Sequence, residues 1–151
     1  MRYDKVRLGN SSTKKPMGHA KSGAERPLSP HLQIYRPMLT MMMSIAHRVS
    51  GAANAIGFLL LAWWLVAISM GPEAYAQVSA FFGSIPGRLL LFLFSWSLIH
   101  HMLGGIRHLI WDTGRGLDKV SIEIFAWATI IGSTALTVLV WVVGYWLKGA
   151  F

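Results

Sequence analysis

The chain has 151 residues, of which 54% are hydrophobic and 13% charged, with a formal net charge of +8 and no cysteine. Its mean hydropathy of +0.47 favours a membrane protein, because a domain of this size has too little interior to bury so much apolar surface. The lack of cysteine excludes disulfides, thiolate metal sites, cysteine-ligated iron–sulfur clusters and a cysteine nucleophile.

A basic arm precedes the first apolar run. Nine of the fourteen Lys and Arg residues lie between Arg2 and Arg48. This placement is typical of an orientation signal that contacts anionic lipid headgroups. Nucleic-acid binding is disfavoured because the arm lacks the aromatic and basic platforms that such binding uses. We therefore expect residues 1–42 to form a basic arm with a docking segment, and residues 43–151 to form a transmembrane domain.

Three long runs without formal charge follow the arm. The runs cover residues 49–72, 89–106 and 124–147, and we expect membrane spans around them over about residues 45–71, 86–111 and 123–147. Each reaches the roughly 18–20 residues that a helix needs to cross a hydrocarbon core of about 30 Å. Isolated strands are excluded because they would leave backbone polar groups unpaired in lipid. The sequence therefore predicts an all-α membrane protein with three transmembrane helices.

The connections between the runs indicate the orientation in the membrane. The first connection, broken by glycine and proline in "MGPEAY" and "GSIPG", has no Lys or Arg before Arg88 at its far edge. The second connection, "DTGRGLDK", carries Arg115 and Lys119. The positive-inside rule then predicts that the N-terminus and the second connection lie on the cytoplasmic or matrix side, and the C-terminus on the other side.

The second span contains the polar stretch "SWSLIHHMLGGIRHLIWDTG". His101 and His108 are seven residues apart, which places them within about 20° on one helix face. Gly104 and Gly105 follow one turn after His101 and remove side chains where a flat ligand would approach the backbone. Arg107 lies beside His108 near the cytoplasmic end, where cations can meet carboxylates. An imidazole, small residues and nearby cations are what a haem requires.

Simpler interpretations of this stretch stay open on spacing alone. An intramembrane histidine can hydrogen-bond a neighbouring helix, and paired glycines can mark a close helix crossing. Arg107 can be an orientation charge. His100 points about 100° away from His101, so we expect His100 to be a packing or lipid-edge residue.

A second polar group, "MSIAHRVSG", lies at the start of the first span. Ser44 and Arg48 are four residues apart and share a helix face, and Ser44 and His47 nearly do. A hydroxyl and a guanidinium at the membrane boundary can donate hydrogen bonds to a carbonyl of a lipid-soluble ligand. The alternative is that Ser44 caps the helix and Arg48 anchors it among headgroups.

The six acidic residues all lie outside the three apolar runs. A proton pump or ion transporter would be expected to place carboxylates within its spans, so a small transporter is disfavoured. The chain also has no phosphate-binding glycine loop and no nucleophile–base motif, and we expect no self-contained catalytic site.

Two motifs together resemble a known family. The run "RPLSPHLQIYRPMLTMMMSIAHRVSG", followed by "HMLGGIRHLIWDTG", is similar to the cytochrome b subunit of succinate dehydrogenase, the larger membrane anchor of respiratory complex II. The resemblance covers nearly the whole chain, and its first motif is similar to the mitochondrial and alphaproteobacterial branch.

The resemblance implies specific roles for residues of both motifs. It implies that His101 is an axial ligand of haem b, with the other ligand supplied by a second, smaller anchor subunit. It also implies that residues near the haem and its propionates are His47, Arg107 and His108, and that residues of the ubiquinone site are Ser44 and Arg48. Asp112 matches an acidic position at the cytoplasmic surface.

The resemblance also implies a function and a set of partners. The chain would anchor a succinate:ubiquinone oxidoreductase in the bacterial cytoplasmic membrane, a mitochondrial location being less expected. Succinate would be oxidised on a flavoprotein subunit, and electrons would reach ubiquinone through an iron–sulfur subunit onto which residues 26–35 would dock. The chain alone would not oxidise succinate. The alternative is a haem-free structural anchor whose histidines only pack.

Overall fold

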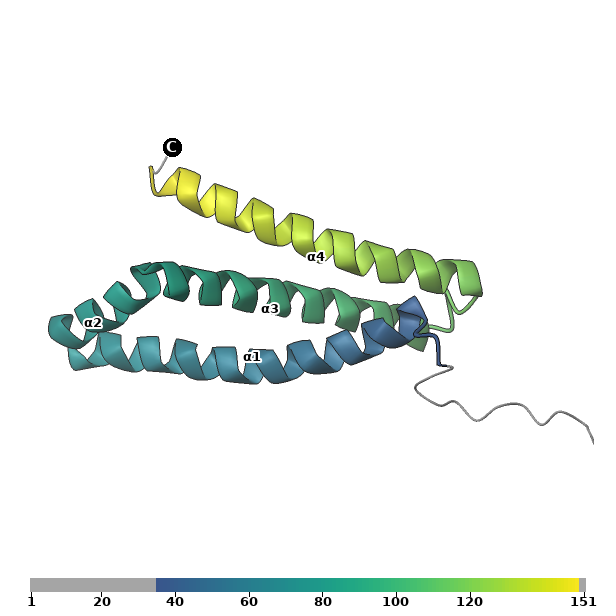
Figure 1. The fold of residues 1–151 in the computed structure, drawn as a ribbon, viewed down its shortest axis with the longest axis horizontal. Helices are drawn as coiled ribbons and strands as arrows, with labels where there is room; N and C mark the ends of the chain where they lie inside the picture. The colour runs from purple at the N-terminus through teal and green to yellow at the C-terminus, as the bar shows by residue number, and fades with distance from the viewer. Residues whose placement is uncertain (1–34, 150–151) are drawn as a thin grey trace, which may run out of the picture. The chain divides into compact units, whose positions relative to one another are not determined.

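A computed structural model of the chain describes residues 35–149. Within this range the chain forms four helices, which are α1 (Leu39–Met70), α2 (Pro72–Gly83), α3 (Ile85–Asp112) and α4 (Lys119–Leu147) (Figure 1). The predicted docking segment at residues 26–35, and all but the last residues of the predicted basic arm, lie outside the described residues. The predicted boundary between arm and transmembrane domain, at residues 42 and 43, lies inside α1.

Three of the helices are long enough to span a membrane. Helices α1, α3 and α4 contain 32, 28 and 29 residues, and each is apolar enough to cross a bilayer. The prediction of an all-α protein with three membrane-spanning helices is thus confirmed. Helices α1 and α4 begin several residues before the predicted spans, at Leu39 and Lys119, because a helix can continue beyond the hydrocarbon core.

Helix α2 was not predicted, because the glycines and prolines around it indicated only breaks. Gly71 ends α1 with φ of +108°, a backbone conformation that favours glycine. Pro72 then occupies the first turn of α2, where its missing N–H is not needed. The same residues that end one span therefore also start a short helix within the connection.

Side-chain caps fix the starts of α3 and α4. The Ser84 hydroxyl accepts a hydrogen bond from the Gly87 amide at 3.3 Å. The Asp118 carboxylate accepts one from the Ser121 amide at 2.9 Å. Hydrogen bonds from Ser121 lower the pKa of Asp118, since they stabilise the ionised form. The cap of α4 is therefore ionised at neutral pH.

Helix α3 packs against both α1 and α4, which contact each other less (Figure 1). The helix contacts are formed largely by small and polar side chains. The buried polar or charged residues are Ser50, Asn54, Ser97, His100, Arg107, Thr129, Ser133 and Thr137. Such contacts are typical of membrane helices, because lipid provides no hydrophobic drive for helix association. Most large apolar side chains point outward, as expected of helices that face lipid or other subunits.

Candidate functional site

Three histidines from two helices gather where the N-terminal half of α1 meets the C-terminal half of α3. The rings of His47 on α1 and His101 on α3 are stacked, with centroids 4.0 Å apart and planes 4° apart. The ring of His108, two turns further along α3, lies 5.3 Å from His47. The predicted common face of His101 and His108 is therefore the face that packs against α1.

Hydrogen bonds at Nδ1 determine how His101 is protonated. Its Nδ1 lies 3.1 Å from the backbone oxygen of His47 and 3.2 Å from the Ser50 hydroxyl. The Ser50 hydroxyl itself donates to the same His47 oxygen at 2.8 Å. A backbone carbonyl only accepts hydrogen bonds, so Nδ1 of His101 carries the proton. In a neutral imidazole Nε2 then has the free lone pair, which is the form that binds a metal.

Glycines allow this close contact between α1 and α3. A Cβ atom at Gly104 would collide with the His47 ring, and one at Gly51 would lie 3.1 Å from Cε1 of His101. Gly104 therefore makes room for His47, rather than for a flat ligand as expected from the sequence. Gly105 has no heavy atom near its Cβ position within 4 Å, so open space lies one turn from His101.

These observations test whether the chain fits a haem. The half-buried His101 ring is oriented through Nδ1, its Nε2 can ligate, and the neighbouring turn at Gly105 is open. Within residues 35–149, no three histidine or acidic side chains gather as they would around a protein-ligated metal ion. Among the described residues, His101 therefore offers a positioned and partly exposed imidazole of the kind that ligates a haem.

Arg107 lies on a different side of α3 from His101. It is buried, and its guanidinium lies over the Trp111 ring, 5.0 Å from the ring centroid. It lines a small cleft with Phe125 and Thr129 of α4, and its Nε has no partner among the described residues. The Arg107 guanidinium is thus held against Trp111 and α4, and His108 of the histidine cluster contacts the same Trp111 ring edge-on at 5.3 Å.

Ser44 and Arg48 are both exposed on α1. Their spacing of four residues places them on one helix face, and Arg48 directly follows His47 of the histidine cluster. No hydrogen bond within the described residues holds either side chain against the rest of the chain. Both side chains are therefore accessible to a ligand or to another subunit from outside the helical bundle.

His100 has a different environment from its neighbour. Only 2% of its surface is exposed, its ring stacks on Trp96 at 4.9 Å, and its Nδ1 lies 3.3 Å from the Ser133 hydroxyl of α4. The prediction of a packing residue is confirmed, and its lipid-edge alternative is wrong. Sequence reasoning missed Ser50, although its position three residues after His47 places both on nearly the same side of α1.

Comparisons with known proteins now identify the family. A family model described as "Succinate dehydrogenase/Fumarate reductase transmembrane subunit" matches residues 22–140. The chain belongs to this family. As a member of the succinate dehydrogenase/fumarate reductase transmembrane subunits, it is an integral membrane subunit, in agreement with its three apolar helices.

Individual relatives agree with this assignment. The chain is 42% identical over 118 residues to the "Succinate dehydrogenase cytochrome b556 subunit" of Paracoccus denitrificans, covering 78% of this chain and 91% of the relative. It is 37% identical over 118 residues to the protein of the same name from Rickettsia prowazekii, covering 78% and 92%. It is 38% identical over 97 residues to the "Succinate dehydrogenase cytochrome b560 subunit, mitochondrial" of Homo sapiens, covering 63% and 57%.

Proposed function

We propose that the chain is the membrane-anchor subunit of a succinate:ubiquinone oxidoreductase, and that it binds haem b and contributes to ubiquinone reduction. The observation that carries the proposal is the fixed His101 imidazole, whose Nδ1 donates to the His47 backbone oxygen. The printed names of the relatives, which describe cytochrome b subunits of succinate dehydrogenase, support the same function.

His101 would be the axial ligand that this chain supplies. The His47 carbonyl and the Ser50 hydroxyl hold the proton on Nδ1, so Nε2 would be free to ligate the iron of a haem. A bound haem would supply a one-electron redox centre beside the route of the electrons. The open space at Gly105 and the incomplete burial of His101 support a haem between this chain and a second, smaller anchor subunit, which would supply the other ligand.

Cations near the cytoplasmic end of α3 would meet the haem propionates. His108 lies at this end of α3, and the ring of His47 on α1 lies next to it, with centroids 5.3 Å apart. Arg107 would have to reach a propionate from the α4 side of the helix, where its guanidinium lies over Trp111. Its unpartnered Nε leaves one donor for a carboxylate, since a buried donor without a partner is costly.

Ser44 and Arg48 would bind ubiquinone. Both are exposed donors on one face of α1, so a hydroxyl and a guanidinium can donate hydrogen bonds to a quinone carbonyl from the bundle surface. Arg48 would also stabilise the negative charge that reduction places on that oxygen. Two electrons and two protons convert the quinone to the quinol, and the protons would come from the adjacent aqueous side.

The remaining subunits would supply the other steps. Succinate would be oxidised on a flavoprotein subunit, and an iron–sulfur subunit would pass the electrons to the quinone bound beside Ser44 and Arg48. We propose that the N-terminus and the α3–α4 connection face the cytoplasm of a bacterium, because Arg115 and Lys119 lie in or next to that connection.

An absorbance spectrum of the purified complex tests the haem ligand. The reduced complex should show a b-type α-band, which His101→Gln should weaken or shift while the subunits still assemble. His100→Gln is the matched control, because it removes the adjacent imidazole, which faces α4, and should leave the band in place. An unchanged band in His101→Gln would contradict the ligand assignment, and a wild-type complex without the band would indicate a haem-free anchor.

A pair of activity assays tests the quinone site. Arg48→Ala should lower succinate–quinone reductase activity by roughly 10- to 100-fold, as expected for the loss of a hydrogen bond from a charged donor. Succinate oxidation with a soluble acceptor should be unchanged. Equal loss of both activities would point to a role of Arg48 in assembly. Arg36→Ala is the control, since it removes another exposed cation from the N-terminal side of α1.

A further inference from the structure

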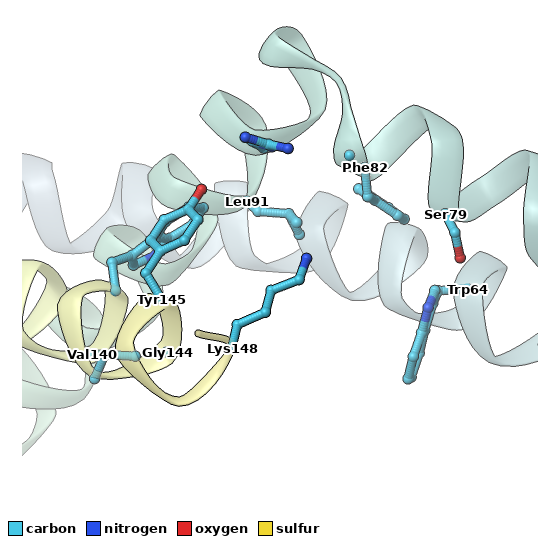
Figure 2. Close-up of a pocket in the computed structure, with 11 residues that line it drawn as sticks. Trp64, Ser79, Phe82, Leu91, Val140, Gly144, Tyr145 and Lys148 are labelled. Carbon is cyan, nitrogen blue, oxygen red and sulfur yellow. The ribbon is translucent and has the colours of Figure 1, made fainter. Parts of the chain in front are cut away.

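A cleft lies at the opposite end of the bundle from the histidine cluster (Figure 2). It has a volume of about 440 Å³ and is bounded by the end of α1, by α2, by the start of α3 and by the end of α4. Figure 2 shows the Lys148 side chain reaching into the cleft from the end of α4, with Leu91 and Phe82 on the opposite wall. Its polar and aromatic lining includes Trp64, Ser79, Phe82, Arg88, Tyr145 and Lys148.

The charge in this cleft is entirely positive. Arg88 and Lys148 line it, and no Asp or Glu does. Arg88 lies in the first turn of α3, where the helix dipole disfavours a cation. An anion between Arg88 and Lys148 would compensate both charges, and the helix N-terminus would favour it further.

Two further clefts, each sharing lining residues with the one before it, follow α1 and α3 toward the middle of the spans and are together called the groove. A second cleft of about 270 Å³ between α1 and α3 shares Trp64, Phe82 and Leu91 with the first and has no polar lining residue apart from the Trp64 ring nitrogen. A third, of about 230 Å³, overlaps the second and extends to Ser97. From Arg88 to Ser97 the helix rises roughly 14 Å, close to half of the about 30 Å hydrocarbon core.

The position of the cleft matches the membrane surface. It lies where two spans end and one begins, and the aromatic residues Trp64, Trp141 and Tyr145 line it. Tyrosine and tryptophan are enriched at the level of the lipid headgroups. A cationic cleft at this level, joined to an apolar groove about one leaflet deep, has the shape and charge of a phospholipid site.

We propose that this chain binds an anionic phospholipid, with its phosphate between Arg88 and Lys148 and an acyl chain in the groove between α1 and α3. The occupant is a lipid rather than a soluble anion because the cleft opens into an apolar groove that a free phosphate would leave empty. The site is separate from the histidine cluster and from Ser44 and Arg48, so it does not depend on the function proposed above.

Counting bound lipids in the assembled complex tests the proposal. The complex is reconstituted into vesicles of phosphatidylcholine with a minor fraction of phosphatidylglycerol, extracted, and analysed by native mass spectrometry. Wild-type complex should retain phosphatidylglycerol in excess of its share in the vesicle. Arg88→Gln or Lys148→Gln should weaken retention about fivefold each, and the double variant on the order of thirtyfold, from about 1 kcal/mol per cation near a membrane surface.

A matched double variant controls for net charge. Arg115→Gln with Lys119→Gln removes two exposed cations from the α3–α4 end of the bundle and should retain as much phosphatidylglycerol as wild type. Three outcomes would overturn the proposal: wild-type retention in proportion to the vesicle composition, equal retention by both double variants, or loss of a protein subunit instead of lipid from the Arg88 and Lys148 variant. The haem spectrum of the same samples keeps a failure here distinct from a failure of the proposed function.

Discussion

Helix α3 presents two faces of similar composition, which differ in how far their histidines are buried. Toward α1 it presents His101 and Gly104, and toward α4 it presents His100 and Arg107. His100 is enclosed by Trp96 and α4. The His101 ring is only half-buried, although it stacks on His47 and is bonded at Nδ1. Adjacent histidines, 100° apart on a helix, are thus divided into a packing residue and a candidate ligand.

The difference shows why histidine content alone does not identify a haem site. Both rings have Nδ1 hydrogen-bonded to a neighbouring helix, and both can present an unprotonated Nε2. That of His100 is buried without a partner among the described residues. His101 is only half-buried, so the burial of the side chain distinguishes the ring that a ligand as large as a haem could reach from the ring that it could not.

On the face of α3 that packs against α4, replacing His100 should cause the largest loss of stability. His100→Ala should lower the stability of the complex by roughly 2–4 kcal/mol, because it leaves a cavity in a buried helix contact. His100→Phe, which fills the volume, should cost much less. Thermal unfolding of the purified complex measures the loss. A shift of the haem α-band in His100→Ala would contradict the distinction between the two histidines, because it would indicate that His100 acts at the iron.

A methyl group at Gly104 should disturb the α1 side. Gly104→Ala places a Cβ against the His47 ring and should cost about 1–3 kcal/mol, as expected for overpacking. Gly105→Ala meets no heavy atom of this chain within 4 Å and should leave the unfolding temperature unchanged. Equal destabilisation by both variants would show that helix propensity, rather than contact with His47, determines the cost.

Replacing Arg107 tests whether a residue on the α4 side of α3 contacts a haem propionate. If its guanidinium meets a propionate, Arg107→Met should lower the haem midpoint potential by about 60 mV, equivalent to a tenfold change for one electron. The direction follows because loss of a nearby cation favours the oxidised form. Arg115→Met, which removes an exposed cation from the same end of the bundle, should leave the potential unchanged. An unchanged potential in Arg107→Met, with a changed unfolding temperature, would make Arg107 a packing residue.

Replacing Ser50 should cause the smallest change, a shift of the haem midpoint potential. Ser50→Ala removes one acceptor near the Nδ1 proton of His101, which makes the imidazole a slightly weaker electron donor. A hydrogen bond contributes about 0.5–1.5 kcal/mol, so the midpoint potential should rise by about 20–60 mV. Ser50→Thr, which keeps a hydroxyl, should restore it. A potential that falls in Ser50→Ala would contradict the assignment of the proton to Nδ1.

Part of the site was predictable from the sequence because it follows from helix geometry. The seven-residue spacing of His101 and His108 predicted a shared face, and the spacing of Ser44 and Arg48 predicted another. The contacts of Arg107 were not predictable, because spacing along one helix does not reveal which neighbouring helix each face meets. The same limit led Gly104 to be assigned to a ligand, although it accommodates His47.

The sequence by itself determined the membrane class and the three spans, since the length and apolarity of each run leave few other structures in lipid. Its two motifs also predicted the family to which the chain belongs. Only the tertiary structure decided which imidazole is enclosed, where the proton of His101 lies, and how two distant cations come to share a cleft with α2. These properties depend on contacts between helices, which local periodicity does not specify.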